Sequence, residues 1–166
     1  RAARTAESSL SPARASYVAS SSEQFPDIND RRVVADRVAG QGAAGGIYTA
    51  LCDAPTEWIF VLACDLPLVT PEFISFLKSM ISTGCDAILP TDTTGRWQPL
   101  CAFYRIENCR PLFAKALAID GRRPSIRRLL ASINTSIVSY SEYAGCSGSE
   151  RLLANLNTPT DLDGIQ

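Results

Sequence analysis

Histidine is absent from this 166-residue chain. Its absence excludes Ser-His-Asp triads, Cys-His dyads and histidine-ligated metals. An excess of one charge sign is also lacking, because 16 Lys and Arg face 17 Asp and Glu. The composition therefore favours neither nucleic acid nor an anionic membrane as a partner. No apolar run approaches the roughly 18 residues of a membrane span, and no signal peptide is recognisable. Chemistry in this chain must rest on carboxylates, amides, arginines, backbone groups or a hard metal.

The cysteines lack the spacing of a metal site or a redox motif. None of the six forms a C-x-x-C pair, and four lie in apolar or helical contexts, as small hydrophobic residues do. We therefore expect reduced thiols in a cytoplasmic protein rather than a disulfide framework or a zinc site. The cysteines are Cys52, Cys64, Cys85, Cys101, Cys109 and Cys146.

The length predicts a single domain spanning residues 1–166. Short apolar runs alternate with segments whose apolar residues recur at helical spacing. Strands are expected at 16–20, 33–35, 58–64, 86–90, 99–104, 136–140 and 151–157. Residues 1–10 are expected to be the tail of a helix. Further helices are expected at 47–54 after a glycine-rich loop at 40–46, from 70 to about 81, at 108–119, at 124–133 and after 158. This alternation predicts an α/β fold with a mostly parallel sheet.

Ligands of parallel α/β sheets bind beyond the carboxyl ends of the strands. Asp36, Asp65 and Asn157 each stand at the end of an expected strand. Asp65 follows the most apolar strand, 58–64, which reads as a central strand covered on both faces. It suits a Mg²⁺ ligand beside phosphates, but it equally suits a turn aspartate that accepts backbone N–H bonds before Pro67.

Three further features allow both a functional and a structural interpretation. The glycine-rich segment 40–46, with Asp36 before it, could admit an anion or be a plain connection. The arginines of 122–128 suit phosphate contacts or form a solvated basic face. Asn155 and Asn157 lie on one face of their strand, as ligand contacts or as structural amides.

The ordered set of these stretches resembles the molybdenum cofactor guanylyltransferases. FVLACDLPLV and NLNTPTDL carry most of the similarity. The similar stretches are VVADRVAGQGAAGGIYTAL, EWIFVLACDLPLVTPEF, DAILP, QPLCAFYR, GRRPSIRRLL and ANLNTPTDL, within residues 33–162.

The resemblance implies a three-layer, Rossmann-like fold of the nucleotide-diphospho-sugar-transferase kind. It implies transfer of GMP from GTP to the molybdenum-bearing molybdopterin, with release of pyrophosphate. Its partners would be GTP and molybdopterin, together with proteins that mature molybdoenzymes. Asp65 matches the family's catalytic, Mg²⁺-binding aspartate. Asp36 matches a nucleotide-contacting aspartate, and the segment containing Gly45 and Gly46 resembles the family's G-P-L-A-G, with Ala43 in place of proline. Arg122, Arg123, Asn155 and Asn157 would lie on the pterin side.

One part of the family pattern is missing. Nothing here matches its first strand and the glycine-rich, basic loop that follows, and YVASSS at 17–22 offers serines where an asparagine is frequent. We therefore expect an amino-terminally truncated copy, with a gap in its sheet, that binds GTP poorly in isolation. The alternatives are a sister nucleotidyltransferase using CTP or a sugar phosphate, and a degenerate, non-catalytic relative.

Overall fold

The computed structural model describes residues 17–19, 33–119 and 123–154. The described strands are β1 Tyr17–Ala19, β2 Val33–Ala35, β3 Trp58–Leu62, β4 Ala87–Pro90, β5 Cys101–Arg105 and β6 Thr135–Val138. The described helices are α1 Gly42–Asp53, α2 Pro71–Ser79, α3 Ile106–Leu117, α4 Ile126–Leu130 and α5 Tyr140–Tyr143. The expected elements at 1–10 and after 158, and the end of the strand expected at 151–157, lie outside the described residues.

Four of the strands form one mixed sheet in the order β3-β5-β4-β6. β5 is antiparallel to both neighbours, whereas β4 and β6 are parallel. β3, β4 and β6 therefore run in the same direction and β5 runs against them, so the expected mostly parallel sheet is a mixed one in which only the β4–β6 pairing is parallel. β1 and β2 form a separate parallel pair, and no described strand bridges the two sheets.

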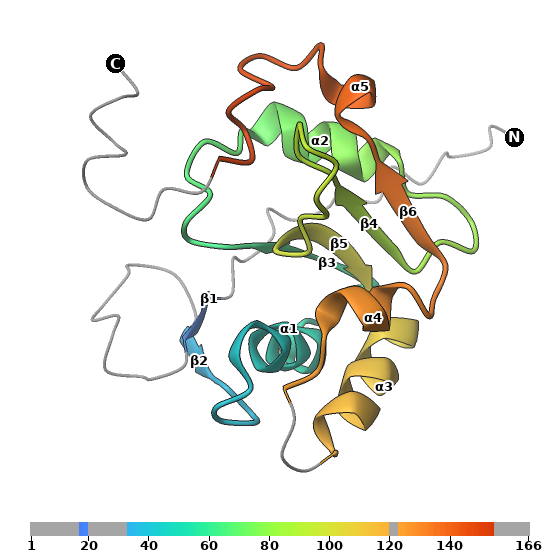
Figure 1. The fold of residues 1–166 in the computed structure, drawn as a ribbon. Coiled ribbons are helices and arrows are strands. Elements are labelled where there is room, and N and C mark those ends of the chain that lie inside the picture. The colour runs from blue at the N-terminus through green and yellow to red at the C-terminus, as the bar shows by residue number, and fades with distance from the viewer. Residues whose placement is uncertain (1–16, 20–32, 120–122, 155–166) are drawn as a thin grey trace, which may run out of the picture.

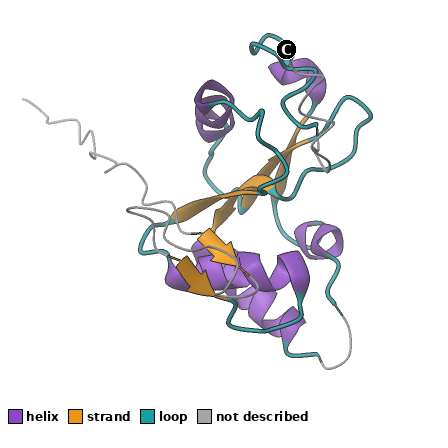
Figure 2. Cartoon of the chain, turned by 90° about the vertical axis from the view of Figure 1, so that its left-hand side faces the viewer, coloured by secondary structure: helices purple, strands orange, loops and turns teal. Residues whose placement is uncertain are grey.

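Helices cover both faces of the four-stranded sheet (Figure 1). α1, α3 and α4 lie on one face and α2 and α5 on the other, as the edge-on view in Figure 2 also shows. Alternation along β4 divides the core between the faces: Ala87 and Leu89 pack toward α1 and α3, and Ile88 packs toward α2. The expected three-layer α/β arrangement is confirmed.

The best predicted helix is α2, because its start carries the local signals. The Thr70 side chain accepts a hydrogen bond from the Phe73 N–H at 3.2 Å, and Pro71 occupies the first helical position. Phe73 and Leu77, one turn apart, are fully buried against the sheet. No helix among the described residues is both long enough and apolar enough to span a membrane.

Several expected boundaries are wrong. α1 begins at Gly42, so most of the glycine-rich stretch expected as a loop is helical. α4 is only five residues long, and residues 151–153 form turns rather than strand. The sequence pattern also missed α5, which begins with a capping box between Ser139 and Glu142.

β3 does not have the covered, central environment that its apolar run predicted. Among the described strands it pairs only with β5 and forms an edge of the four-stranded sheet. Its residues are half-buried or exposed, and the Leu62 side chain is 43% exposed. An apolar run alone does not distinguish a central strand from an edge strand.

Candidate functional site

The three strands of common direction end at the same edge of the sheet, which we call the carboxyl rim. Asp65 follows β3, Thr91 and Asp92 follow β4, and Ser139 follows β6. This is the rim at which α/β sheets of this kind bind ligands.

Asp65 lies in a tight turn with a fixed backbone. Leu66 N–H donates to the Ala63 carbonyl at 3.3 Å, and Ala63 N–H donates to the Leu100 carbonyl at 2.7 Å. Leu66 is buried and anchors the turn. Within the described residues the half-buried Asp65 carboxylate has no hydrogen bond or ion pair, so the bonds to backbone N–H groups of a purely structural aspartate are not observed there.

Asp92, on the same rim, shows what a structural aspartate looks like in this protein. Its carboxylate accepts bonds from Thr94 N–H and Oγ1, Arg96 N–H and Gln98 Nε2, which close the β4–β5 connection. Burial raises the pKa of Asp92, but these four donors outweigh burial and hold the pKa below its usual value. Asp65 has no such set of donors in the part of the chain that the structure describes.

Asp36 follows β2 directly and lies partly buried. Its Oδ1 is enclosed and has no hydrogen-bond partner among the described residues. Burial raises the pKa of this carboxyl group above its ordinary value. The neighbouring residue is fixed, because Arg37 N–H donates to Thr49 Oγ1 at 2.9 Å and Thr49 donates in turn to the Gly45 carbonyl.

The glycine-rich segment packs against this connection. Gly45 is buried inside α1, and a Cβ added there would lie 3.0 Å from the Val38 carbonyl oxygen. Gly46 is also helical and half-buried. Gly40 and Gly42 have φ values of 76° and 57°, which glycine adopts readily. Packing against the Val38 carbonyl therefore explains the glycine at position 45, whether or not that glycine also contacts a ligand.

One of the predicted pterin-side residues reaches this same segment. The exposed Arg123 donates from Nε to the Gly40 carbonyl at 3.1 Å, across 83 residues of sequence. It therefore lies beside the glycine-rich stretch that we assigned to the nucleotide. Arg122, Asn155 and Asn157 lie outside the described residues.

Gln41 is a residue that the sequence reasoning missed. It is the N-cap residue of α1, but its side chain makes no capping hydrogen bond. Like Asp36 Oδ1, its Oε1 is enclosed and has no hydrogen-bond partner within residues 17–19, 33–119 and 123–154. The sequence carried one sign that Gln41 is unusual, because glutamine is not among the preferred N-cap residues.

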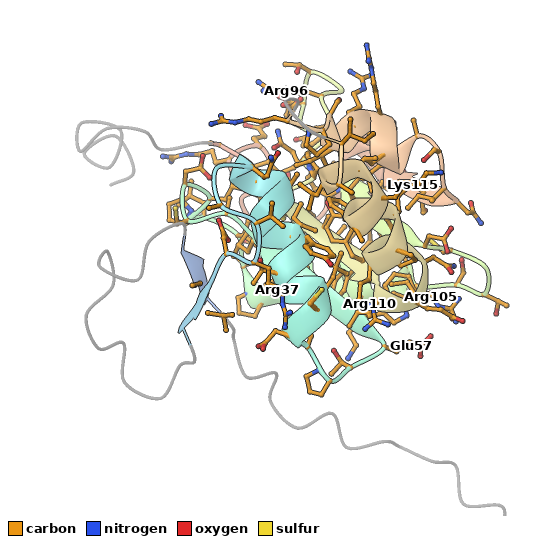
Figure 3. The ribbon with its side chains drawn as sticks, turned by 90° about the horizontal axis from the view of Figure 1, so that it is seen from below. Arg37, Glu57, Arg96, Arg105, Arg110 and Lys115 are labelled. Atoms are coloured by element: carbon orange, nitrogen blue, oxygen red, sulfur yellow. The ribbon has the colours of Figure 1, made fainter. Side chains whose placement is uncertain are left out.

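The opposite edge of the sheet is occupied by structural polar contacts. Buried Asp86 accepts bonds from Asn108 Nδ2 at 2.5 Å and from Asn134 N–H at 3.0 Å. Arg105 pairs with Glu57 at 2.9 Å, and Figure 3 shows the two at one end of the α1–α3 layer. These contacts tie elements together, although Arg105 Nε is enclosed and has no hydrogen-bond partner among the described residues, and we assign no ligand to this edge.

Two hollows open near the carboxyl rim. One of about 220 Å³ lies between the β4–β5 connection and the segment after α5, lined by residues that include Asp92, Tyr143 and Glu150. A second of about 190 Å³ lies between Leu68 and Leu152. Neither of these two hollows is lined by Asp36 or Asp65.

A metal site built from protein side chains alone is not found in the described part of the chain. No group of three or more His, Cys, Asp or Glu side chains that could hold a metal occurs among the described residues. A Mg²⁺ ion needs no such group, since it binds through one or two carboxylates plus substrate phosphates.

The six cysteines are unpaired, as predicted, and burial raises the pKa of Cys101 and Cys109 to about 12.

Comparison with known proteins places this geometry in a family. The model of the "MobA-like NTP transferase domain" matches residues 1–137. The chain is 34% identical over 130 residues to the "Probable molybdenum cofactor guanylyltransferase" of Geobacillus sp. (strain WCH70), covering 78% of this chain and 63% of that protein. It is also 34% identical over 139 residues to the protein of that name from Methanothermobacter thermautotrophicus, covering 81% and 67%.

Solved structures agree with these relatives. "Molybdopterin-guanine dinucleotide biosynthesis protein A" of Archaeoglobus fulgidus superposes with a TM-score of 0.68 at 27% identity, covering 82% of this chain and 67% of that chain. The 2-C-methyl-D-erythritol 4-phosphate cytidylyltransferase of Thermus thermophilus shares the fold, with a TM-score of 0.62, 13% identity and coverages of 89% and 78%. The chain spans 63% and 60% of the Geobacillus and Peptoclostridium acidaminophilum relatives that it matches. The chain belongs to the MobA-like NTP transferase domain family of nucleotidyltransferases.

Proposed function

We propose that this domain serves the transfer of GMP from GTP to the terminal phosphate of the molybdenum-bearing molybdopterin. A phosphate oxygen of the acceptor attacks the α-phosphorus of GTP, the bond from that phosphorus to the bridging oxygen breaks, and pyrophosphate leaves with the electron pair. The reaction needs positioning and charge neutralisation rather than a protein nucleophile. A chain without histidine is suited to it.

The observation that carries the proposal is the Asp65 carboxylate, which has no partner within the described residues, on the carboxyl rim of a nucleotidyltransferase domain. A hard carboxylate oxygen with no protein partner among the described residues, on a turn fixed by the Ala63–Leu100 bond, fits the ligand set of Mg²⁺. When bound, the ion would neutralise charge on the phosphates of GTP. The protein's own contribution is to hold the Asp65 oxygen at the rim.

The remaining assignments form a nucleotide side and an acceptor side. Asp36, Gly45 and Gly46 would contact GTP at the start of α1. Arg122, Arg123, Asn155 and Asn157 would contact the acceptor. The Arg123–Gly40 bond supports a position for Arg123 where the two sides meet. Molybdoenzyme maturation proteins would then receive the guanine dinucleotide product in the cytoplasm.

Nucleotide titration followed by protein NMR tests this function, because it detects weak binding. GTP with Mg²⁺ should shift resonances of residues 36–46 and 64–66, more strongly than GTP with a chelator, CTP with Mg²⁺ or a sugar phosphate. Preference for CTP or a sugar phosphate would favour the sister nucleotidyltransferases. If no nucleotide shifts any resonance of this chain or of an amino-terminally extended form, the degenerate relative is the better account.

A further inference from the structure

The turn that carries Asp65 is hydrogen-bonded to a neighbouring turn of the chain. Leu66 N–H donates to the Ala63 carbonyl at 3.3 Å, which makes Asp65 the third residue of a β-turn. Ala63 N–H donates to the Leu100 carbonyl at 2.7 Å and continues the antiparallel pairing of β3 with β5. Because this backbone bond lies at the base of the turn, the position of the Asp65 carboxylate follows the position of Leu100.

Leu100 belongs to a second turn, at residues 98–101. Cys101 N–H donates to the Gln98 carbonyl at 3.0 Å, and Pro99 occupies the second position, which proline favours in β-turns. The buried Tyr104 donates from its hydroxyl group to the Pro99 carbonyl at 2.5 Å. The carbonyl groups of residues 98, 99 and 100 are therefore all hydrogen-bonded, and the second turn forms a rigid link between β5 and the Asp65 turn.

Gln98 ties this second turn to the end of β4 by two hydrogen bonds. Its N–H donates to the Pro90 carbonyl at 3.0 Å, and its side-chain Nε2 donates to Asp92 Oδ2 at 3.1 Å. One bond alone would let the turn pivot about it, whereas two bonds to separate points fix its orientation. The stretch QPLCAFYR, which begins at Gln98, otherwise has no role in the proposed function.

The two oxygens of the Asp92 carboxylate bind different donors. Oδ1 accepts from Thr94 N–H, Thr94 Oγ1 and Arg96 N–H, at 2.9, 2.6 and 3.0 Å, and closes the β4–β5 connection. Within the part of the chain that the structure describes, Oδ2 accepts from Gln98 alone. Because Oδ1 already closes the connection, the bond between Oδ2 and Gln98 serves the turn at 98–101.

We propose that Gln98 is a positioning residue for the divalent-ion site. Its bond to Asp92 holds the turn at 98–101 in place. Through the Leu100 carbonyl, that turn holds the Asp65 carboxylate in the orientation that binds the ion. This inference rests on the proposed function and deepens it, because it assigns control of ion affinity to a side chain that is not itself a ligand of the ion.

Two other roles for Gln98 lead to different expectations. A contact that serves the fold alone would change the free energy of unfolding and leave the ion affinity as it is. A direct contact in which Gln98 donates to GTP would be lost with any ionised carboxylate at this position, since a carboxylate accepts hydrogen bonds and does not donate them. A positioning bond needs a donor on one side and an acceptor on the other, in either direction.

The test removes the bond in one variant and reverses it in another. Gln98→Met removes the donor at similar side-chain length, and Gln98→Glu combined with Asp92→Asn exchanges donor and acceptor at unchanged net charge. Mn²⁺ affinity with GTP present is measured from the broadening of the Asp65 amide resonance, and hydrogen exchange of Ala63 N–H is measured without ligand. Gln98→Met should weaken Mn²⁺ binding roughly 10-fold. It should also speed Ala63 exchange roughly 3- to 10-fold, the worth of one neutral hydrogen bond. The double variant should match wild type in both measurements.

Thr94→Val is the matched control, because it removes a donor to Oδ1 of the same carboxylate and leaves the bond from Gln98 in place. It should leave ion affinity and Ala63 exchange at their wild-type values. Unchanged Mn²⁺ affinity in Gln98→Met would overturn the positioning role, and so would a double variant that binds as weakly as Gln98→Met. Absence of Mn²⁺ binding by wild type would overturn the proposed function, whereas unchanged Ala63 exchange in Gln98→Met would overturn the positioning role separately.

Discussion

Some carboxylates in the described residues accept hydrogen bonds from protein donors, and others do not. This difference identifies the candidate nucleotide site better than residue type does. Asp86 and Asp92 each accept several protein donors and are structural. Asp36 has an enclosed oxygen without a donor, and Asp65 has no partner among the described residues. The sequence predicted Asp36 and Asp65 from their places after strands, but it missed Gln41, an uncommon residue type at an N-cap.

The pKa shift of Asp36 leads to a prediction about pH. Its folded-state pKa is raised, so the folded chain binds more protons than the unfolded chain above the usual carboxyl range. The free energy of unfolding therefore falls as pH rises through that window, and ionised Asp36 destabilises the fold at pH 7. Asp36→Asn should be more stable than wild type at pH 7, by urea denaturation, and the difference should shrink toward pH 4.

Asp92→Asn provides a control of opposite sign. The folded-state pKa of Asp92 is lowered, so its ionised form stabilises the fold above the usual carboxyl range, and that contribution is lost as pH falls through the folded pKa. Asp92→Asn should be less stable than wild type at pH 7, and this deficit should shrink in acid. Equal pH profiles for the two variants would contradict the assignment of one carboxylate to a ligand and the other to the fold.

At the scale of elements, prediction succeeded where local chemistry sets a boundary. Thr70 and Pro71 begin α2 where their residue types predict. It failed at α1, because glycines were read as a loop although Gly45 lies inside the helix. In that case tertiary packing against the Val38 carbonyl outweighed helix propensity, which no single-sequence pattern records.

The cap of α2 is testable because this helix carries Phe73 and Leu77 into the core. Thr70→Ala removes the oxygen that accepts the Phe73 N–H and should lower the free energy of unfolding by about 1 kcal/mol. Thr93→Ala, at an exposed position in the β4–β5 connection, should change it by less than about 0.5 kcal/mol. Equal losses in the two variants, measured by urea denaturation, would argue against the capping role.

Across the whole molecule, the alternation of apolar runs and helical segments was sufficient to predict the three-layer class and the common direction of β3, β4 and β6. It was not sufficient to predict the reversal of β5 or the edge position of β3, because strand order depends on pairing between residues far apart in the sequence. The candidate site depends mainly on the common direction of β3, β4 and β6, because that direction brings the ends of the three strands to one rim.

The central claim is that Asp65 holds a divalent ion against the phosphates of GTP. Paramagnetic line broadening by Mn²⁺, which carboxylates and phosphates bind as they bind Mg²⁺, tests it most directly. With GTP present, broadening should centre on the amide resonances of Cys64, Asp65 and Leu66. It should disappear in Asp65→Asn, with the melting temperature kept within about 2 °C of wild type. Broadening centred on Asp92 and Glu150, or unchanged by Asp65→Asn, would contradict the account.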